Sequence, residues 1–219
     1  MRVLGVDGCR GGWVGLVLGD GSDVTAVAGA TVASIAAAVG PVDVIGVDIP
    51  IGLPTTAPRA ADLAAQRFLG ARRSTVFSTP VREALEAATL TEAIAVARAR
   101  TGGGISAQAY ALRSRILEVD AWAPGAGVDV REVHPEVSFA VMSGAPMAAS
   151  KRSWNGLHDR LAALAAAGIE LPRRLGVAGS TAGIDDVVDA AAVAWSAGRI
   201  AAGTAVPFPC PPDGPAIWA

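Results

Sequence analysis

The chain has 219 residues, of which 52% are hydrophobic and 17% charged, and its formal net charge is −2. This composition is typical of a globular protein and excludes a disordered chain, and the length suits one large domain or one domain that carries an insertion. The weakly acidic balance gives no general sign of a nucleic-acid binder.

Neither a membrane helix nor a signal peptide is expected. The apolar stretches are shorter than the roughly 20 residues that a membrane helix needs, and residues 1–8, MRVLGVDG, resemble a strand. We therefore expect a cytoplasmic protein without a membrane partner. In that compartment Cys9 and Cys210 are expected to be thiols, and the two histidines are too few to indicate a zinc site.

The first fifty residues predict a mixed sheet. Apolar runs bounded by glycine-containing turns indicate strands at residues 2–7, 13–18 and 24–29. A short helix at 31–39 leads to another buried strand at 42–50. This β-β-β-α-β order combines hairpin strands with a crossover connection, which requires both antiparallel and parallel pairing.

The rest of the chain is predicted to be mainly helical. One strand is expected at residues 128–134, where Pro135 ends it, and residues 207–215 form a proline-rich tail expected to wrap over the surface. The expected helices are 59–69, 81–100, 105–119, 155–167 and 185–202, and residues 72–80 are irregular.

Arginine is concentrated in one part of the chain. Residues 59–115 contain nine arginines against four acids, although the chain as a whole is acidic. Arginine suits bidentate contact with phosphate, so this segment is a candidate for nucleic-acid contact. A solvated helical face remains an equal interpretation.

Four aspartates are candidates for one site. Asp7 and Asp48 lie at the C-terminal ends of predicted strands, where ligands gather in open α/β sheets. Asp186 and Asp189 share a face of the last helix, and Asp189 lies among Ala and Val, where a carboxylate is costly without a cation. Together they suit Mg²⁺ or Mn²⁺ and metal-assisted phosphodiester cleavage. The alternative for a strand-end aspartate is a turn cap.

Several segments together resemble a bacterial family of unknown function. Its members are described as predicted ribonuclease H-like nucleases, distantly related to Holliday-junction resolvases. The segments are GVDGCRGGWV, VDIPIGLP, RRSTVFSTP, EVHPEVSFAVMSG, SKRSWNGLHDR and DDVVDAAAVAWSAGR. The resemblance implies a single α/β domain over 1–219, with a ribonuclease H-like mixed β-sheet flanked by helices. It also implies a basic, mainly helical insertion at about 55–120, between the fourth and fifth strands.

The resemblance also implies roles for individual acids. Asp7 corresponds to the leading catalytic acid, Asp48 to a second acid, and Asp186 with Asp189 to the two aspartates of the last helix. These four residues would hold the metal ions. Glu136 is expected to be an accessory catalytic ligand.

Residues that bind substrate are expected around these acids. His134 is a candidate proton donor or substrate contact, with a packed histidine as the alternative. Packing against nearby backbone is likewise an alternative for the other polar side chains. The full set expected to bind substrate is Arg10, Arg72, Arg73, Ser78, Thr79, Gln108 and His134.

Three functions are therefore open. The first is a metal-dependent nuclease acting on DNA or RNA. The second is a nucleotide-binding phosphotransferase of the actin-like or sugar-kinase type, because the glycines of residues 8–12 could let backbone N–H groups approach phosphate. The third is a nucleic-acid-binding module without turnover. A homodimer is compatible with any of them.

Overall fold

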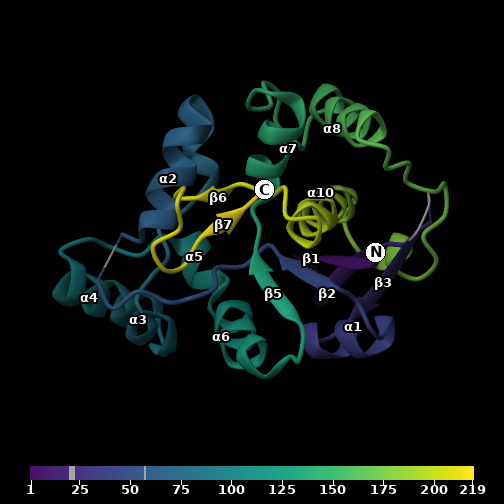
Figure 1. Ribbon diagram of the computed structural model, residues 1–219. Coiled ribbons are helices and arrows are strands. Elements are labelled where there is room, and N and C mark those ends of the chain that lie inside the picture. The colour runs from purple at the N-terminus through teal and green to yellow at the C-terminus, as the bar shows by residue number, and fades with distance from the viewer. Residues whose placement is uncertain (20–22, 57) are drawn as a thin grey trace.

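A computed structural model describes residues 1–19, 23–56 and 58–219 of the chain (Figure 1). Its centre is a five-stranded sheet in the order β3-β2-β1-β4-β5. β1 pairs antiparallel with β2, and β2 with β3, whereas β1, β4 and β5 run parallel. The strands are β1 (Val3–Cys9), β2 (Gly12–Leu18), β3 (Val24–Gly29), β4 (Val44–Val47) and β5 (Asp129–Glu132). The predicted mixed sheet is thus confirmed.

The helix α10 (Ile184–Ala201) packs directly on one face of the sheet. Glycine and alanine permit this close approach: a Cβ atom on Gly5 of β1 would lie 2.1 Å from the backbone nitrogen of Ala194 and 2.3 Å from the carbonyl oxygen of Ala190. The position of α10 against β1 is therefore fixed by backbone contact. α7 (Pro135–Ser143) and α8 (Trp154–Ala166) pack on α10, on the same side of the sheet (Figure 1).

The opposite face is covered by α1 (Val32–Val39) and α6 (Arg113–Trp122) (Figure 1). Glu118 of α6 joins the layers, because its carboxylate accepts hydrogen bonds from the indole of Trp13 at 3.2 Å and from the backbone N–H of Val32 at 2.7 Å. Both faces of the sheet are therefore buried, as expected for apolar strands of this kind.

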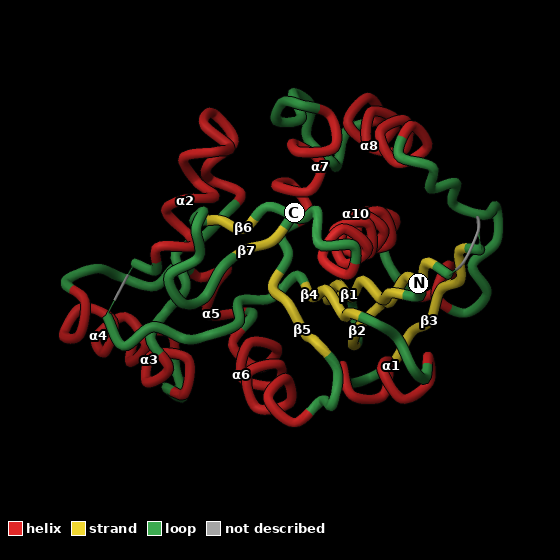
Figure 2. Tube along the Cα trace, in the orientation of Figure 1, coloured by secondary structure: helices red, strands yellow, loops and turns green. Residues whose placement is uncertain are grey.

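The chain between β4 and β5 is mainly helical, and Figure 2 shows α2 to α5 beside the sheet, whereas α6 lies on its face. Its elements are α2 (Ala60–Leu69), η1 (Gly70–Thr75), α3 (Arg82–Glu86), α4 (Leu90–Thr101), α5 (Ala107–Ala111), α6 and η2 (Ala123–Gly125). The prediction of one helix over 81–100 is wrong: Thr89 and Glu92 form a capping box that starts α4 separately. The single helix predicted over 105–119 is also divided into two helices, since Leu112 ends α5 and α6 follows at once.

The C-terminal part differs most from the prediction. α7 was not expected, because Pro135 was interpreted only as the end of a strand, whereas it is also the first residue of α7. The short α9 (Ala178–Thr181) was missed as well. The tail forms a hairpin of β6 (Pro207–Phe208) and β7 (Ile217–Trp218), and Trp218 bridges to Val133 beyond β5. Across the described residues, no helix is both long and apolar enough to cross a membrane.

Candidate functional site

Two of the predicted acids lie side by side on neighbouring parallel strands. Val6 of β1 is in register with Val47 of β4, and the backbone N–H of Asp48 donates to the carbonyl of Val6 at 2.9 Å. Asp7 is buried, and its Oδ1 accepts a hydrogen bond from the N–H of Gly8 at 2.6 Å. Asp48 follows the end of β4 as expected, whereas β1 continues two residues beyond Asp7.

The helix α10 supplies the other two acids. Asp189 is 2% exposed, although it carries a charge, and its Oδ1 has no hydrogen-bond partner. Asp186 lies one turn earlier and accepts a hydrogen bond from the N–H of Gly183 at 3.2 Å, so it also caps its own helix. The direct packing of α10 on β1 brings this pair to Asp7.

The charges of these aspartates act on one another. Burial raises the pKa of Asp7 well above its ordinary value, and the neighbouring charges of Asp48, Asp189 and Asp186 raise it further. Burial likewise raises the pKa of Asp48 to about 7 and that of Asp189 to about 6, although a nearby lysine opposes both shifts. The structure therefore unites the four predicted acids in one cluster that favours a proton or a cation.

The lysine is Lys151, in the loop between α7 and α8. It donates a hydrogen bond to Asp189 Oδ2 and lies 4.0 Å from Asp185 Oδ2. Burial alone would lower the pKa of Lys151, but the charges of Asp189, Asp7 and Asp48 hold that pKa above its usual range. Sequence reasoning missed this residue. The available signal was that Lys151 is the only lysine of an arginine-rich chain.

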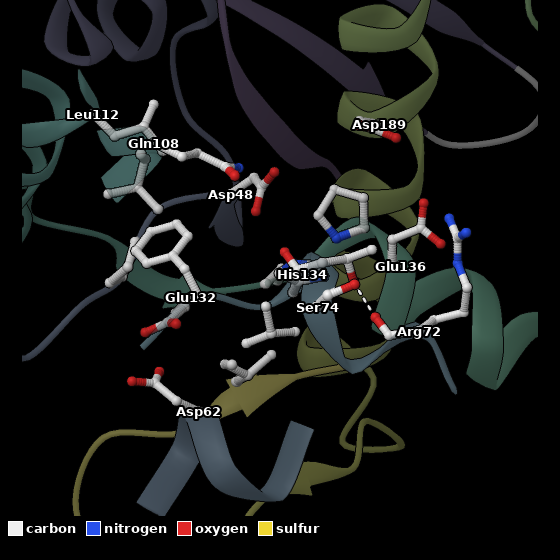
Figure 3. Close-up of a pocket in the computed structure, with 18 of the residues that line it drawn as sticks. Asp48, Asp62, Arg72, Ser74, Gln108, Leu112, Glu132, His134, Glu136 and Asp189 are labelled. Carbon is white, nitrogen blue, oxygen red and sulfur yellow. Dashed lines mark hydrogen bonds between the residues drawn. The ribbon is translucent and has the colours of Figure 1, made fainter. Parts of the chain in front are cut away.

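A cavity of about 400 Å³ opens at this cluster (Figure 3). Asp48, Asp189 and Lys151 line it on the side of the sheet and α10. Residues of η1 and α5 and the first residues of α7 line other parts of it. The site is therefore a pocket at the edge of the sheet, and segments far apart in the sequence form its walls.

The residues expected to bind substrate are only partly brought together. Arg72, Thr79, Gln108 and His134 line the cavity. Thr79 has a structural role, because its N–H and its hydroxyl both donate hydrogen bonds to the carboxylate of Asp62. Arg10, Arg73 and Ser78 are not among the described residues that line the cavity. Each of these side chains is exposed at another part of the surface.

His134 fits the packed interpretation as well as the functional one. Its Nε2 lies 3.3 Å from the carbonyl oxygen of Thr75, and its Nδ1 is buried without a partner. Burial lowers the pKa of His134, so the ring is neutral at neutral pH. A neutral ring can hold η1 in place and still present one nitrogen to a ligand.

The two glutamates near the cavity belong to ion pairs. Arg160 of α8 donates to Glu136 Oε1 at 2.6 Å, and both side chains are buried. The guanidinium nitrogens of Arg59 donate hydrogen bonds to the carboxylate oxygens of Glu132 and Asp62, with N–O distances of 2.6 to 3.0 Å. Glu136 therefore has a structural partner, although its Oε2 has none and remains available to a ligand.

The cluster has the chemistry of a divalent-cation site but is not arranged as one. Among the described residues, no three His, Cys, Asp or Glu side chains are placed to hold a metal ion as they stand. The donors are nevertheless of the right kind, since hard carboxylate oxygens suit Mg²⁺ and Mn²⁺ and Asp189 Oδ1 is buried without a partner. In the structure the ammonium group of Lys151, which donates to Asp189 Oδ2, supplies the positive charge at this cluster.

Many arginines of the arginine-rich segment bind other groups of the chain, some of them at the surface. Arg82 binds Asp120, Arg100 binds Glu83, and Arg115 donates to the carbonyls of Cys9 and Gly12 in the turn between β1 and β2. Arg59 is also paired, as described above. Of the arginines expected to contact substrate, Arg72 both lines the cavity and has a buried Nε without a partner.

Comparison with known proteins gives a match to a protein family. A family model described as "Protein of unknown function (DUF429)" matches residues 5–214, almost the whole chain. Neither the curated proteins nor the solved structures gave a match.

Proposed function

The chain belongs to the family described as "Protein of unknown function (DUF429)", and from its site we propose that it is a divalent-metal-dependent nuclease that hydrolyses phosphodiester bonds. The observation that carries the proposal is the convergence of Asp7, Asp48 and Asp189 from β1, β4 and α10. The buried carboxylates of Asp7 and Asp189 and the half-buried carboxylate of Asp48 are expensive to maintain together for stability alone.

The architecture supports the same proposal. Three antiparallel strands followed by a helix and two parallel strands agree with the β-β-β-α-β pattern of a ribonuclease H-like fold. On this interpretation the segment between β4 and β5 is an insertion that has become one wall of the active site.

Each group of the site has a separate task in this mechanism. Asp7, Asp48 and Asp189, with Asp186 beside them, would hold a divalent cation, which when bound helps to activate a water molecule and to neutralise the leaving oxygen. Lys151, whose side chain is 34% exposed and which lines the cavity, would turn from Asp189 towards the substrate phosphate. Arg72, which also lines the cavity, would contact that phosphate.

The experiment is a cleavage assay with a matched variant. The chain, Asp48→Asn and the exposed control Asp159→Asn are incubated with Mn²⁺ and a labelled panel of single-stranded RNA, RNA–DNA hybrid, duplex DNA and a four-way junction. We expect the chain and the control to cut at least one substrate, and EDTA or Asp48→Asn to abolish cutting.

Two results would replace the proposal. Tight, Mg²⁺-dependent ATP binding without cleavage would favour the phosphotransferase, and nucleic-acid binding without cleavage would favour a binding module. An Asp48→Asn variant that cuts as fast as the chain would refute the site.

A further inference from the structure

The cavity is lined by more than the carboxylate cluster. Asp48 and Asp189 line it, and so do Thr75 of η1 and Leu112 at the end of α5. Its volume of about 400 Å³ lies in the range of small-molecule sites, about 300–1,000 Å³. A ligand held within this cavity is therefore of small-molecule size.

The walls differ in chemistry along the cavity. Figure 3 shows Gln108 and Leu112 at one end, Arg72 at the other, and Asp48 between them. Phe77 adds an aromatic ring to the lining. Apolar and aromatic side chains suit the faces of a nucleobase, and an amide suits its hydrogen-bonding edge.

The phosphate-binding groups complete this pattern. Lys151 and Arg152 come from the loop before α8, and Arg72 comes from η1. The buried Nε of Arg72 has no partner within the protein, which indicates that its guanidinium is available for an external acceptor. Figure 3 thus places Arg72 apart from Gln108 and Leu112, with Asp48 nearer to Gln108 and Asp189 and Glu136 nearer to Arg72.

From these observations we infer that the site takes one unpaired nucleotide of a strand, with its base against Gln108, Phe77 and Leu112 and its phosphate at Arg72. The inference rests on the proposed nuclease function and names its substrate class. A base-paired nucleotide carries its partner with it, whereas a volume of about 400 Å³ suits one small ligand. On this inference a duplex must present a strand end, a flap or a flipped nucleotide, and extruding a paired base has a free-energy cost.

The first test compares cleavage rates in Mn²⁺. The substrates are a single-stranded oligonucleotide, the same sequence in a continuous duplex, and that duplex with one unpaired nucleotide. We expect the single strand to be cut about 100-fold faster than the duplex interior, and the unpaired nucleotide to restore cutting beside it. Equal cutting of the duplex interior, with an inactive Asp48→Asn variant, would overturn the inference and leave the nuclease proposal standing.

The second test measures binding without turnover. Nucleoside monophosphates are titrated into the chain and into Arg72→Ala, Gln108→Ala and the exposed control Arg73→Ala, by calorimetry in Mg²⁺. We expect binding to weaken about 10-fold in the Arg72 variant, because a charge-assisted hydrogen bond is lost, and to be unchanged in the Arg73 control. Such binding without any cleavage would support the nucleotide site and reject the nuclease. Absence of binding to the chain would overturn the inference.

Discussion

Lys151 donates a hydrogen bond to Asp189 at the centre of the carboxylate cluster, where the proposed mechanism requires a metal ion. The ammonium group of Lys151 and a divalent cation therefore compete for the same carboxylates.

Removing the lysine should strengthen metal binding. In Lys151→Met the cluster loses the ammonium group that competes with a metal ion. We therefore expect Mn²⁺ to bind about 10-fold more tightly in the absence of substrate, a gain of roughly 1.4 kcal/mol in binding free energy. Calorimetric titration measures this change, with Arg98→Met as the control for an exposed charge that does not line the cavity. Unchanged or weaker Mn²⁺ binding in Lys151→Met would show that the lysine does not occupy the metal position.

The raised pKa of Asp48 gives a pH-dependent effect on stability. Because its pKa is about 7 in the folded chain and near 3.9 in the unfolded chain, the folded state binds more protons between these values. Stability contributed by this group is therefore lost as the pH rises from about 4 through 7.

Asp48→Asn should consequently stabilise the metal-free protein at high pH. We expect its free energy of unfolding in EDTA to exceed that of the parent by about 1 kcal/mol or more at pH 8, and by less at pH 5. Urea denaturation at both pH values, with Asp159→Asn as control, measures the difference. A variant that is less stable at pH 8 than the parent would contradict the repulsion between the acids.

The contact between β1 and α10 should tolerate no added side-chain atom. Gly5→Ala would put a Cβ within 2.3 Å of two backbone atoms of α10, so the helix that carries Asp189 must move. We expect a loss of about 3 kcal/mol in stability and weaker Mn²⁺ binding, as overpacking costs typically 1–3 kcal/mol. Gly103→Ala, which meets no atom closer than 3.6 Å, should be nearly neutral. Equal stabilities of the two variants would disprove the tight packing.

The role of Glu136 can be separated from that of the aspartates. Because Glu136 pairs with the buried Arg160, Arg160→Met leaves a buried charge without a partner and should cost about 3–5 kcal/mol of stability. Glu136→Gln should also destabilise the protein but should leave Mn²⁺ affinity within about twofold if its role is mainly this pairing. A large loss of Mn²⁺ affinity with unchanged stability would instead identify Glu136 as a metal ligand.

The sheet and the acid cluster could be predicted because their signals are local. Apolar runs ended by turns locate β1, β2 and β4, and the Asp–Val–Val–Asp spacing places Asp186 and Asp189 on one helix face. The capping box of Thr89 and Glu92 was also readable, and it would have divided the helix predicted over 81–100.

The missed features depend on tertiary contacts. Pro135 is compatible both with the end of a strand and with the first turn of a helix, so the sequence alone did not reveal α7. The tail strands β6 and β7 are two residues each and depend on tertiary contacts, such as the burial of Ile217 and the bridge from Trp218 to Val133. The pairing of Lys151 with Asp189 spans 38 residues and has no local pattern.

The measurement that tests the central claim most directly is the Mn²⁺-dependent rate at which the chain and its Asp7→Asn variant cut a single-stranded oligonucleotide. Asp7 lies in β1, and the charges of the other three aspartates raise its pKa. Replacing it should therefore abolish cleavage, while circular dichroism shows an intact fold. We predict cleavage by the parent and a rate for Asp7→Asn no higher than that of the parent in EDTA. Equal rates for the two proteins would contradict a nuclease site at these carboxylates.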